Sequence, residues 1–115
     1  MRKLTHKMIK SIEDGNNVVL CTILASSGSS PRGAGARMAV FADGSTMGTV
    51  GGGRVELLAA EEAHEVLKTG KTRVRAFCLA PDQVSSIGMI CGGNVTIYYQ
   101  LLTADDLPVL HRMED

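Results

Sequence analysis

A chain of 115 residues, 44% of them hydrophobic, is long enough to bury one core, so we expect a single domain over residues 1–115. Twelve basic and twelve acidic residues give a formal charge of zero, which argues against nucleic-acid binding because a phosphate backbone requires an excess of cations. No stretch approaches the ~20 apolar residues of a membrane span, and the first ten residues lack the apolar core of a secretory signal. We therefore expect a cytoplasmic protein without a nucleic-acid or membrane partner.

The first 25 residues predict a helix followed by a buried strand. Apolar residues recur at helical spacing before a glycine suited to end the helix: Leu4, Met8, Ile12 and Gly15. Residues 16–25 are apolar at successive positions and rich in β-branched side chains, which is typical of a central strand covered on both faces. Cys21 is therefore expected in the core.

A β-hairpin is predicted next. Residues 36–42 and 45–50 have strand-forming composition, and Asp43-Gly44 between them suits the positive φ angles of a tight turn. The two segments should therefore pair with each other.

The most regular helical pattern follows three glycines. Residues 54–70 are rich in helix formers, and Gly70 follows the expected end of the helix. Five apolar residues fall on one stripe of this helix: Val55, Leu58, Ala59, Ala63 and Val66. We expect that stripe to pack on a sheet.

The segment TRVRAFCL alternates in the manner of a strand. Val74, Ala76 and Cys78 fall on one side, and Arg73 and Arg75 fall on the other. The side with the cysteine is expected to face inward, where its thiol would be inert.

The last strand and helix complete the expected fold. Residues 94–102 alternate again, and a short helix begins near Asp105 or Asp106, where Pro108 is tolerated in the first turn. The fold class is α+β, with a mixed, mainly antiparallel sheet, a β-hairpin and two to three helices. Periodicity leaves the strand order open, but a strand over residues 94–102 at a sheet edge could pair between subunits and form a homodimer.

Glycine is concentrated in three loops. Eleven of the 13 glycines lie within residues 28–53 or 88–93, and all of these except Gly44 fall in loops spanning residues 26–37, 48–56 and 87–94. Glycine-rich backbone can turn its amides toward a bulky or anionic ligand. No loop has the Walker A pattern, and the first lacks the third glycine of the dinucleotide fingerprint.

The middle loop runs directly into a predicted helix. The amides of Gly51, Gly52 and Gly53 and the positive end of the helix dipole would meet on an anion there, and Arg54 would add charge. Alternatively, the glycines only allow a close turn between strand and helix.

The first loop supplies polar donors. Ser29, Ser30, Arg32 and Arg37 offer hydroxyl and guanidinium groups suited to a phosphate or a polar heterocycle, although each could equally be a solvated surface residue. Glu56 could compensate the helix dipole, pair with Arg32 or Arg37, or contact a ligand, and the first of these roles is the simplest.

The third loop holds Cys91 before Gly92 and Gly93. An accessible thiolate there could act as a catalytic nucleophile, a persulfide carrier or a soft-metal ligand, and the alternative is a small buried hydrophobic residue. The three cysteines include no Cys-x-x-Cys pair, and the three histidines are dispersed, so the spacing predicts neither a disulfide framework nor a protein-only zinc site.

Three stretches together carry a family resemblance: GSSPRGAGARM (28–38), DGSTMGTVGGGRVE (43–56) and GMICGGNVTI (88–97). In this order they resemble the signatures of the XdhC/CoxI family, the xanthine dehydrogenase accessory factors. Members of that family mature molybdenum hydroxylases by binding molybdenum cofactor, supporting its terminal sulfuration and handing it to the apoenzyme. The resemblance implies such a role here.

The family's motifs map onto this chain residue by residue. Ser-Ser-Pro-Arg falls on Ser29 to Arg32, Gly-Ala-Arg/Lys-Met on Gly35 to Met38, Gly-Gly-Gly-x-x-Glu on Gly51 to Glu56, and Cys-Gly-Gly on Cys91 to Gly93. Gly33-Ala34 stands where the family often has prolines, which loosens the first loop. The C-terminal Rossmann-like domain of longer members is not expected in this chain.

The resemblance implies a non-catalytic carrier of molybdenum cofactor, that is, of molybdopterin and its metal. The glycines and arginines would hold its anionic and pterin groups, and Cys91 would lie near the metal or its exchangeable sulfur. Expected partners are a molybdenum hydroxylase apoenzyme and either a cysteine desulfurase or a separate Rossmann-domain protein. Two alternatives stay open: a persulfide relay that uses Cys91, and an oligomeric scaffold or regulator.

Overall fold

Three α-helices, one short 3-10 helix and five strands make up the described part of the chain. The structure is a computed structural model that describes residues 2–28, 35–51, 53–79 and 93–114. In chain order the elements are α1 (Arg2–Glu13), β1 (Val18–Gly28), β2 (Arg37–Val40), β3 (Thr46–Gly48), α2 (Gly53–Thr69), β4 (Arg73–Leu79), β5 (Gly93–Leu102), η1 (Ala104–Asp106) and α3 (Leu107–Glu114).

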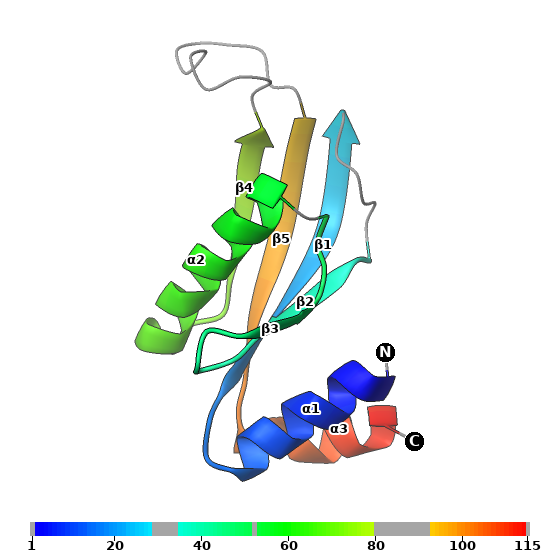
Figure 1. Ribbon diagram of the computed structural model, residues 1–115, viewed down its shortest axis with the longest axis vertical. Coiled ribbons are helices and arrows are strands. Elements are labelled where there is room, and N and C mark those ends of the chain that lie inside the picture. Colours follow the sequence, from blue (N-terminus) through cyan, green and yellow to red (C-terminus); the bar gives the residue numbers. More distant parts are fainter. Residues whose placement is uncertain (1, 29–34, 52, 80–92, 115) are drawn as a thin grey trace.

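The five described strands form one sheet in the order β3-β2-β1-β5-β4, with every neighbouring pair antiparallel (Figure 1). This confirms the α+β class, the hairpin and the central position of the first strand. The homodimer edge expected over residues 94–102 is wrong, because that segment is β5 and both of its sides are occupied. The outer strands of the sheet are β3 and β4.

Two apolar cores lie on opposite faces of the sheet. Val19, Cys21 and Ile23 of β1 belong to the core under α2, whereas Val18 and Leu20 belong to the core shared with α1 and α3. Successive side chains of a strand leave opposite faces, so a continuous apolar run is needed where both faces are covered. The buried-strand pattern of residues 16–25 is thereby confirmed, although β1 continues to Gly28, inside the segment expected to be a loop.

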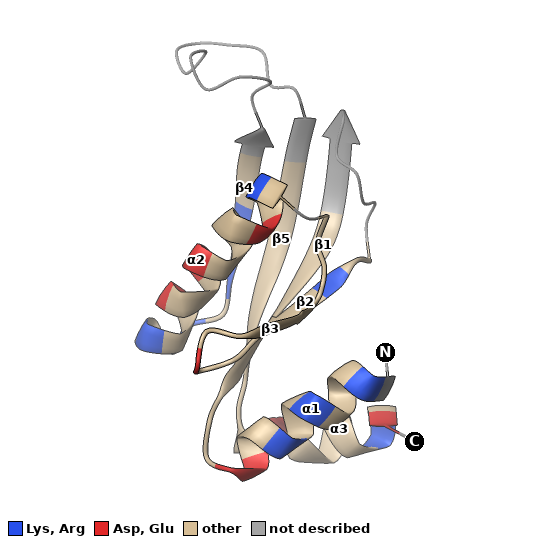
Figure 2. Ribbon diagram, in the orientation of Figure 1, with Lys and Arg blue, Asp and Glu red and all other residues tan. Residues whose placement is uncertain are grey.

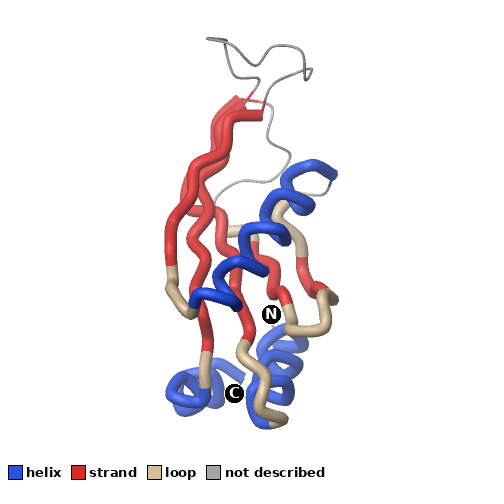
Figure 3. Tube along the Cα trace, turned by 90° about the vertical axis from the view of Figure 1, so that its left-hand side faces the viewer, coloured by secondary structure: helices blue, strands red, loops and turns tan. Residues whose placement is uncertain are grey.

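The helices cover unequal parts of the sheet. α2 lies lengthwise over one face, whereas α1 and α3 pack together at the end of the molecule where β1 begins and β5 ends (Figures 1 and 3). The predicted apolar positions of α1 are buried, and four of the five predicted for α2 are buried: Val55, Ala59, Ala63 and Val66. On the face opposite α2, the half of the sheet toward Gly28 has no described helix over it.

The hairpin between β2 and β3 is confirmed, but its turn differs from the expected two-residue form. The Phe41 amide donates to the Ser45 carbonyl and the Gly44 amide to the Phe41 carbonyl, each over 2.9 Å, which leaves a three-residue loop. Only Gly44 in this loop has positive φ, at 91°. Asp43 Oδ1 instead accepts from the Ser45 amide (2.9 Å) and hydroxyl (2.6 Å), and these bonds lower the pKa of Asp43.

β4 alternates as predicted but faces the other way. Arg73 and Arg75 leave the sheet toward α2, where Arg73 Nη1 lies 2.5 Å and Arg75 Nε 3.2 Å from Glu62 Oε2. Burial by itself raises the pKa of Glu62, but the hydrogen bonds and charges of the two arginines outweigh it and leave the pKa below its usual value. The arginines therefore tie the sheet to α2.

The expectation that the opposite side of β4 faces inward is wrong for the side chains that are described. Val74 is 54% exposed, and Ala76 is also exposed. The Cys78 side chain lies outside the described part of the structure. The physical reason for the reversal is the partly buried carboxylate of Glu62 on α2, which makes the covered face a better place for the arginines than for the aliphatic residues.

The C-terminal helix begins where the sequence indicated. Thr103 Oγ1 accepts from the Asp105 amide (3.3 Å), and Asp106 Oδ2 accepts from the Thr103 amide (2.8 Å). This reciprocal cap satisfies amides at the start of η1 and α3, and Pro108 lies in the first turn of α3. None of the helices in the described ranges has both the length and the apolar character needed to cross a bilayer.

Candidate functional site

Three strand ends meet at one end of the sheet. Gly28, the last residue of β1, pairs with Gly93, the first residue of β5, and Gly93 also pairs with Leu79, the last residue of β4. Paired residues in an antiparallel sheet lie about 4.5–5.5 Å apart. The chain positions at which residues 29–34 and 80–92 attach to the sheet are therefore neighbours, although they are remote in sequence.

Six of the predicted site residues lie outside the described part of the chain: Ser29, Ser30, Arg32, Gly52, Cys91 and Gly92. Their attachment points are nevertheless described. Ser29 directly follows Gly28, and Cys91 precedes Gly93 by two residues. The register thus brings together the backbone that carries the first and third predicted loops.

The connection from β3 to α2 is held by a short hydrogen-bonded chain. The Thr49 hydroxyl donates to Glu56 Oε2 (2.5 Å), and the same hydroxyl oxygen accepts from the Gly51 amide (3.1 Å). Of the three glycine amides expected to face an anion, that of Gly51 already has a partner. Gly53 opens α2, and Arg54 beside it is exposed to solvent.

This connection lies toward the end of the sheet where the strand ends meet. Figure 1 shows the first turn of α2 nearer to that end than the last turn. The start of α2 carries the positive end of the helix dipole, so Arg54 adds its charge to an already positive region. Glu56 is the one acidic residue in this first turn, and it is hydrogen-bonded back to Thr49.

Arg37 does not join this group. It pairs with Thr22 across β1 and β2, and cross-strand partners project from the same face of a sheet. Thr22 shares its face with Leu20, whose core contains α1 and α3. The Arg37 side chain is therefore separated by the sheet from Arg54 and Glu56 on the α2 side.

Thr49 is the site residue that the sequence reasoning missed. It stands two residues before Gly51, the spacing at which a hydroxyl commonly bonds a following backbone amide, so a turn pattern was present in the sequence. Its bond to Glu56 spans seven residues and required the structure to find.

Two polar side chains are buried beneath α2. Burial raises the pKa of the Cys21 thiol to about 12, so it is not a nucleophile at neutral pH and the core position expected for it is confirmed. Tyr99 pairs with Cys21 across the sheet, and burial likewise raises its pKa. Among the described residues its hydroxyl has no hydrogen-bond partner.

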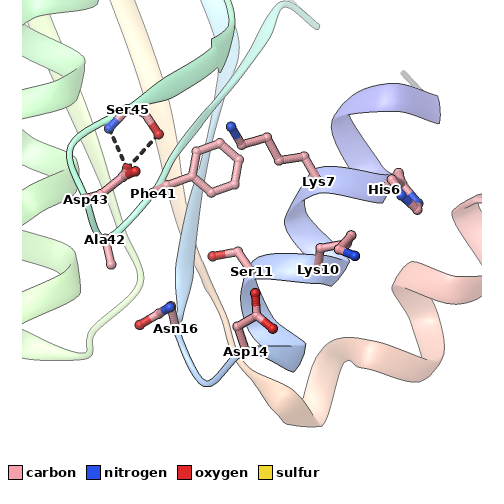
Figure 4. Close-up of a pocket in the computed structure, with 10 residues that line it drawn as sticks. All are labelled: His6, Lys7, Lys10, Ser11, Asp14, Asn16, Phe41, Ala42, Asp43 and Ser45. Carbon is pink, nitrogen blue, oxygen red and sulfur yellow. Dashed lines mark hydrogen bonds between the residues drawn. The ribbon is translucent and has the colours of Figure 1, made fainter.

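A hollow of about 500 Å³ lies between α1 and the β2–β3 turn (Figure 4). The Lys7 ammonium lies 4.9 Å from the centre of the Phe41 ring, and Lys10, Asp14 and Asp43 also line the hollow. Its charges are of both signs, and none of the predicted site residues lines it. In the described ranges, no three His, Cys, Asp or Glu side chains are grouped closely enough to hold a metal ion.

Comparison with known proteins gives consistent matches. The sequence model of the XdhC and CoxI family matches residues 11–78. The chain is 32% identical over 115 residues to the molybdenum cofactor insertion chaperone PaoD of Escherichia coli, a match covering 98% of this chain and 36% of PaoD. It is 38% identical over 79 residues to the uncharacterized protein YqeB of Escherichia coli, covering 69% of this chain and 14% of YqeB.

A solved structure shares the fold. A crystal structure described as a xanthine dehydrogenase from Bacillus halodurans superposes with a TM-score of 0.76 at 24% identity, over 96% of this chain and 34% of that one. The matched region is thus about a third or less of each of these proteins. Because the family model covers more than half of the sequence, this chain belongs to the XdhC and CoxI family.

Proposed function

We propose that this protein binds molybdenum cofactor in the cytoplasm and assists its sulfuration or its insertion into a molybdenum hydroxylase. Support comes from membership of the XdhC and CoxI family and from the likeness to PaoD, itself a molybdenum cofactor insertion chaperone. The observation that supports the proposal is the pairing of Gly28 with Gly93, since it sets the chain position from which residues 29–34 leave the sheet beside the position to which residues 80–92 return.

The roles of individual residues follow from the chemistry of the ligand. Molybdopterin bears a phosphate, a polar pterin and a dithiolene-bound metal, so a carrier needs hydrogen-bond donors, cations and a soft sulfur ligand. In the proposal the donors are Ser29, Ser30 and Arg32, the amides of Gly52, Gly53, Gly92 and Gly93, and Arg54. Glu56 holds the glycine loop through Thr49. Cys91 supplies the sulfur, next to the metal or its exchangeable sulfido group.

The first prediction concerns Cys91. The Cys91→Ala variant should bind molybdenum cofactor about tenfold more weakly, because a soft-metal ligand is lost, equivalent to about 1.4 kcal/mol. Anaerobic titration of the purified chain with the cofactor measures this, and Cys21→Ala serves as the matched control because it removes a thiol from the core. Equal dissociation constants for wild type and Cys91→Ala would defeat the assignment of Cys91.

A second measurement separates a cofactor carrier from a sulfur relay. After incubation with a cysteine desulfurase and its substrate, mass spectrometry should find no added sulfur on Cys91 if the chain only carries cofactor. A persulfide on Cys91, absent from Cys91→Ala, would instead identify a relay that accepts sulfur from the desulfurase. Binding of a hydroxylase subunit with no binding of cofactor would favour a scaffold.

A further inference from the structure

The face of the sheet opposite α2 carries a hollow lined by cations. Its volume is about 500 Å³, and it lies between the first turn of α1 and the strands β2 and β3. Lys3 and Arg37 line it, together with Gly48 and Thr49, and no acid is among its described lining residues. A hollow lined by two cations without an acid favours an anionic occupant.

Neither cation has an acidic partner among the described residues. Elsewhere in the described structure Arg73 and Arg75 share Glu62, and Lys68 lies 3.7 Å from Glu65. Figure 2 shows basic positions along α1, whereas α2 carries acidic positions between basic ones at its two ends. The positive charge of Lys3 and Arg37 is therefore left for an external group.

Arg37 is carried on a well-fixed stretch of backbone. Its carbonyl accepts from the Thr49 amide over 3.0 Å, and the neighbouring Ala36 carbonyl accepts from the Ile23 amide over 2.9 Å. Gly48 on the neighbouring strand lies so close to Arg37 that a Cβ atom at residue 48 would be 2.5 Å from the Arg37 carbonyl oxygen. Because this backbone is held on both sides, binding has to order only the Arg37 side chain and not the backbone that carries it.

A second hollow, also of about 500 Å³, adjoins the first at Arg37, which lines both. Its walls come from β1, β5 and α3, and three of the large hydrophobic residues in it are unusually exposed: Leu24 at 49%, Val109 at 49% and Met113 at 44%. Tyr98 also lines it. Its one acid, Asp106, already accepts from the Thr103 amide.

We infer that Lys3 and Arg37 bind the phosphate of an aromatic phosphate monoester, whose ring occupies the apolar hollow beside Leu24, Tyr98 and Met113. Two cations match a phosphate dianion, and a guanidinium can bind two of its oxygens at once. Aliphatic, thioether and phenol side chains provide the flat contacts that an aromatic ring requires. The inference goes beyond the proposed function, because this site lies on the face of the sheet opposite Arg54 and Glu56 and would be a second site for a phosphate-bearing ligand.

The test uses simple probes and matched variants. Phenyl phosphate and inorganic phosphate are titrated into the full chain, and amide chemical shifts give the dissociation constants. Arg37→Gln and Lys3→Gln should each weaken phenyl phosphate binding about fivefold to tenfold, through loss of a charge-assisted hydrogen bond. Lys68→Gln and Lys71→Gln remove exposed cations in and just after the last turn of α2 and should leave the constant unchanged.

The apolar hollow is tested separately. Wild type should bind phenyl phosphate more tightly than inorganic phosphate, and Leu24→Ser should remove most of that difference while leaving inorganic phosphate binding intact. Equal affinity of wild type for the two probes would overturn the ring placement. An equal loss in Lys68→Gln, or no loss in Arg37→Gln and Lys3→Gln, would overturn the phosphate placement.

Failure of this inference can be told from failure of the proposed function. Phenyl phosphate binding that is unchanged in Arg37→Gln and Lys3→Gln, with a loss of molybdenum cofactor binding in Cys91→Ala, would overturn the phosphate site and leave the proposed function standing. Phenyl phosphate binding that depends on Arg37 and Lys3, in a wild-type chain that does not bind cofactor, would keep the phosphate site and remove the proposed function.

Discussion

Tyr99 buries a hydroxyl group with no partner among the described residues, in the core beneath α2. A buried donor without a hydrogen bond costs stability, so Tyr99→Phe should leave the free energy of unfolding unchanged or raise it by up to about 1 kcal/mol. Denaturant unfolding measures the change, with Tyr98→Phe on the other face of the sheet as the control. A loss of more than about 1 kcal/mol would show that the hydroxyl is bonded.

Substitutions at Gly48 and Gly44 distinguish two costs of adding a side chain: the strain of a positive φ angle, and a clash with neighbouring backbone. Both have φ near 90°, but only Gly48 faces backbone, the Arg37 carbonyl oxygen at 2.5 Å from an added Cβ. Gly44→Ala should therefore lower the free energy of unfolding by about 1 kcal/mol from strain alone, and Gly48→Ala by roughly 2–4 kcal/mol. Equal losses in thermal and denaturant unfolding would contradict the close approach of Gly48 to the Arg37 carbonyl.

The sequence could not indicate where the Arg37 side chain goes. Its motif places it in one loop with Arg32, but the residue begins a strand, and alternation along a strand sends successive side chains to opposite faces. Only the pairing of Arg37 with Thr22 decides its face. By contrast, Cys21 could be assigned to the core from sequence, because a continuous apolar run rich in β-branched residues is typical of a strand covered on both faces.

The link between α2 and β4 gives a pH-dependent contribution to stability. The folded pKa of Glu62 is lowered by Arg73 and Arg75, so its ion pairs are present at neutral pH and are lost as the pH falls through that pKa. Glu62→Gln should lower the free energy of unfolding at pH 7 by about 1 kcal/mol and reduce its dependence on pH below about pH 5.

The control for this prediction is Glu65→Gln, on the same helix. Glu65 has a side chain 55% exposed and lies 3.7 Å from Lys68, so its substitution should change stability by less than about 0.5 kcal/mol. Urea unfolding of wild type and both variants at neutral and acidic pH checks the pair. Identical pH profiles for wild type and Glu62→Gln would contradict the proposed role of Glu62.

Helices α1 and α2 and strand β1 were predictable because each carries many apolar residues at one clear period. Which face of β4 is covered was not predictable, because alternation defines two sides of a strand without saying which one is covered. Here Glu62 on α2 draws Arg73 and Arg75 to the covered face. Strand order was also beyond periodicity, which is why β5 was expected at an edge rather than beside β1. The pairing of Gly28 with Gly93 depends on that order.

The corrected sheet order moves the expected dimer contact to another strand. β3 has three residues and β4 has seven, so β4 offers the longer outer edge. Val74 on it is 54% exposed, and the charged residues of the strand, Arg73 and Arg75, lie on the opposite face at Glu62. We expect a homodimer in solution that Ala76→Pro converts to a monomer, because proline removes a backbone donor from the edge. Sedimentation equilibrium measures the mass, and a dimer that survives Ala76→Pro would contradict pairing through β4.

The molecule extends 45 Å along its longest axis, with α1 and α3 at one end and the meeting strand ends at the other (Figure 1). In the proposed function the end with the strand ends receives the cofactor and gives it up to a hydroxylase. Binding alone would not establish this, since a storage protein would bind the cofactor equally well.

Transfer is therefore the most direct test. The chain loaded anaerobically with molybdenum cofactor is mixed with a cofactor-free molybdenum hydroxylase, and recovery of hydroxylase activity is followed over time. Recovery should be faster than with the same amount of free cofactor, and Cys91→Ala should lose most of that advantage while Cys21→Ala keeps it. Equal recovery with the loaded chain, the heat-denatured chain and free cofactor would contradict a role in cofactor delivery.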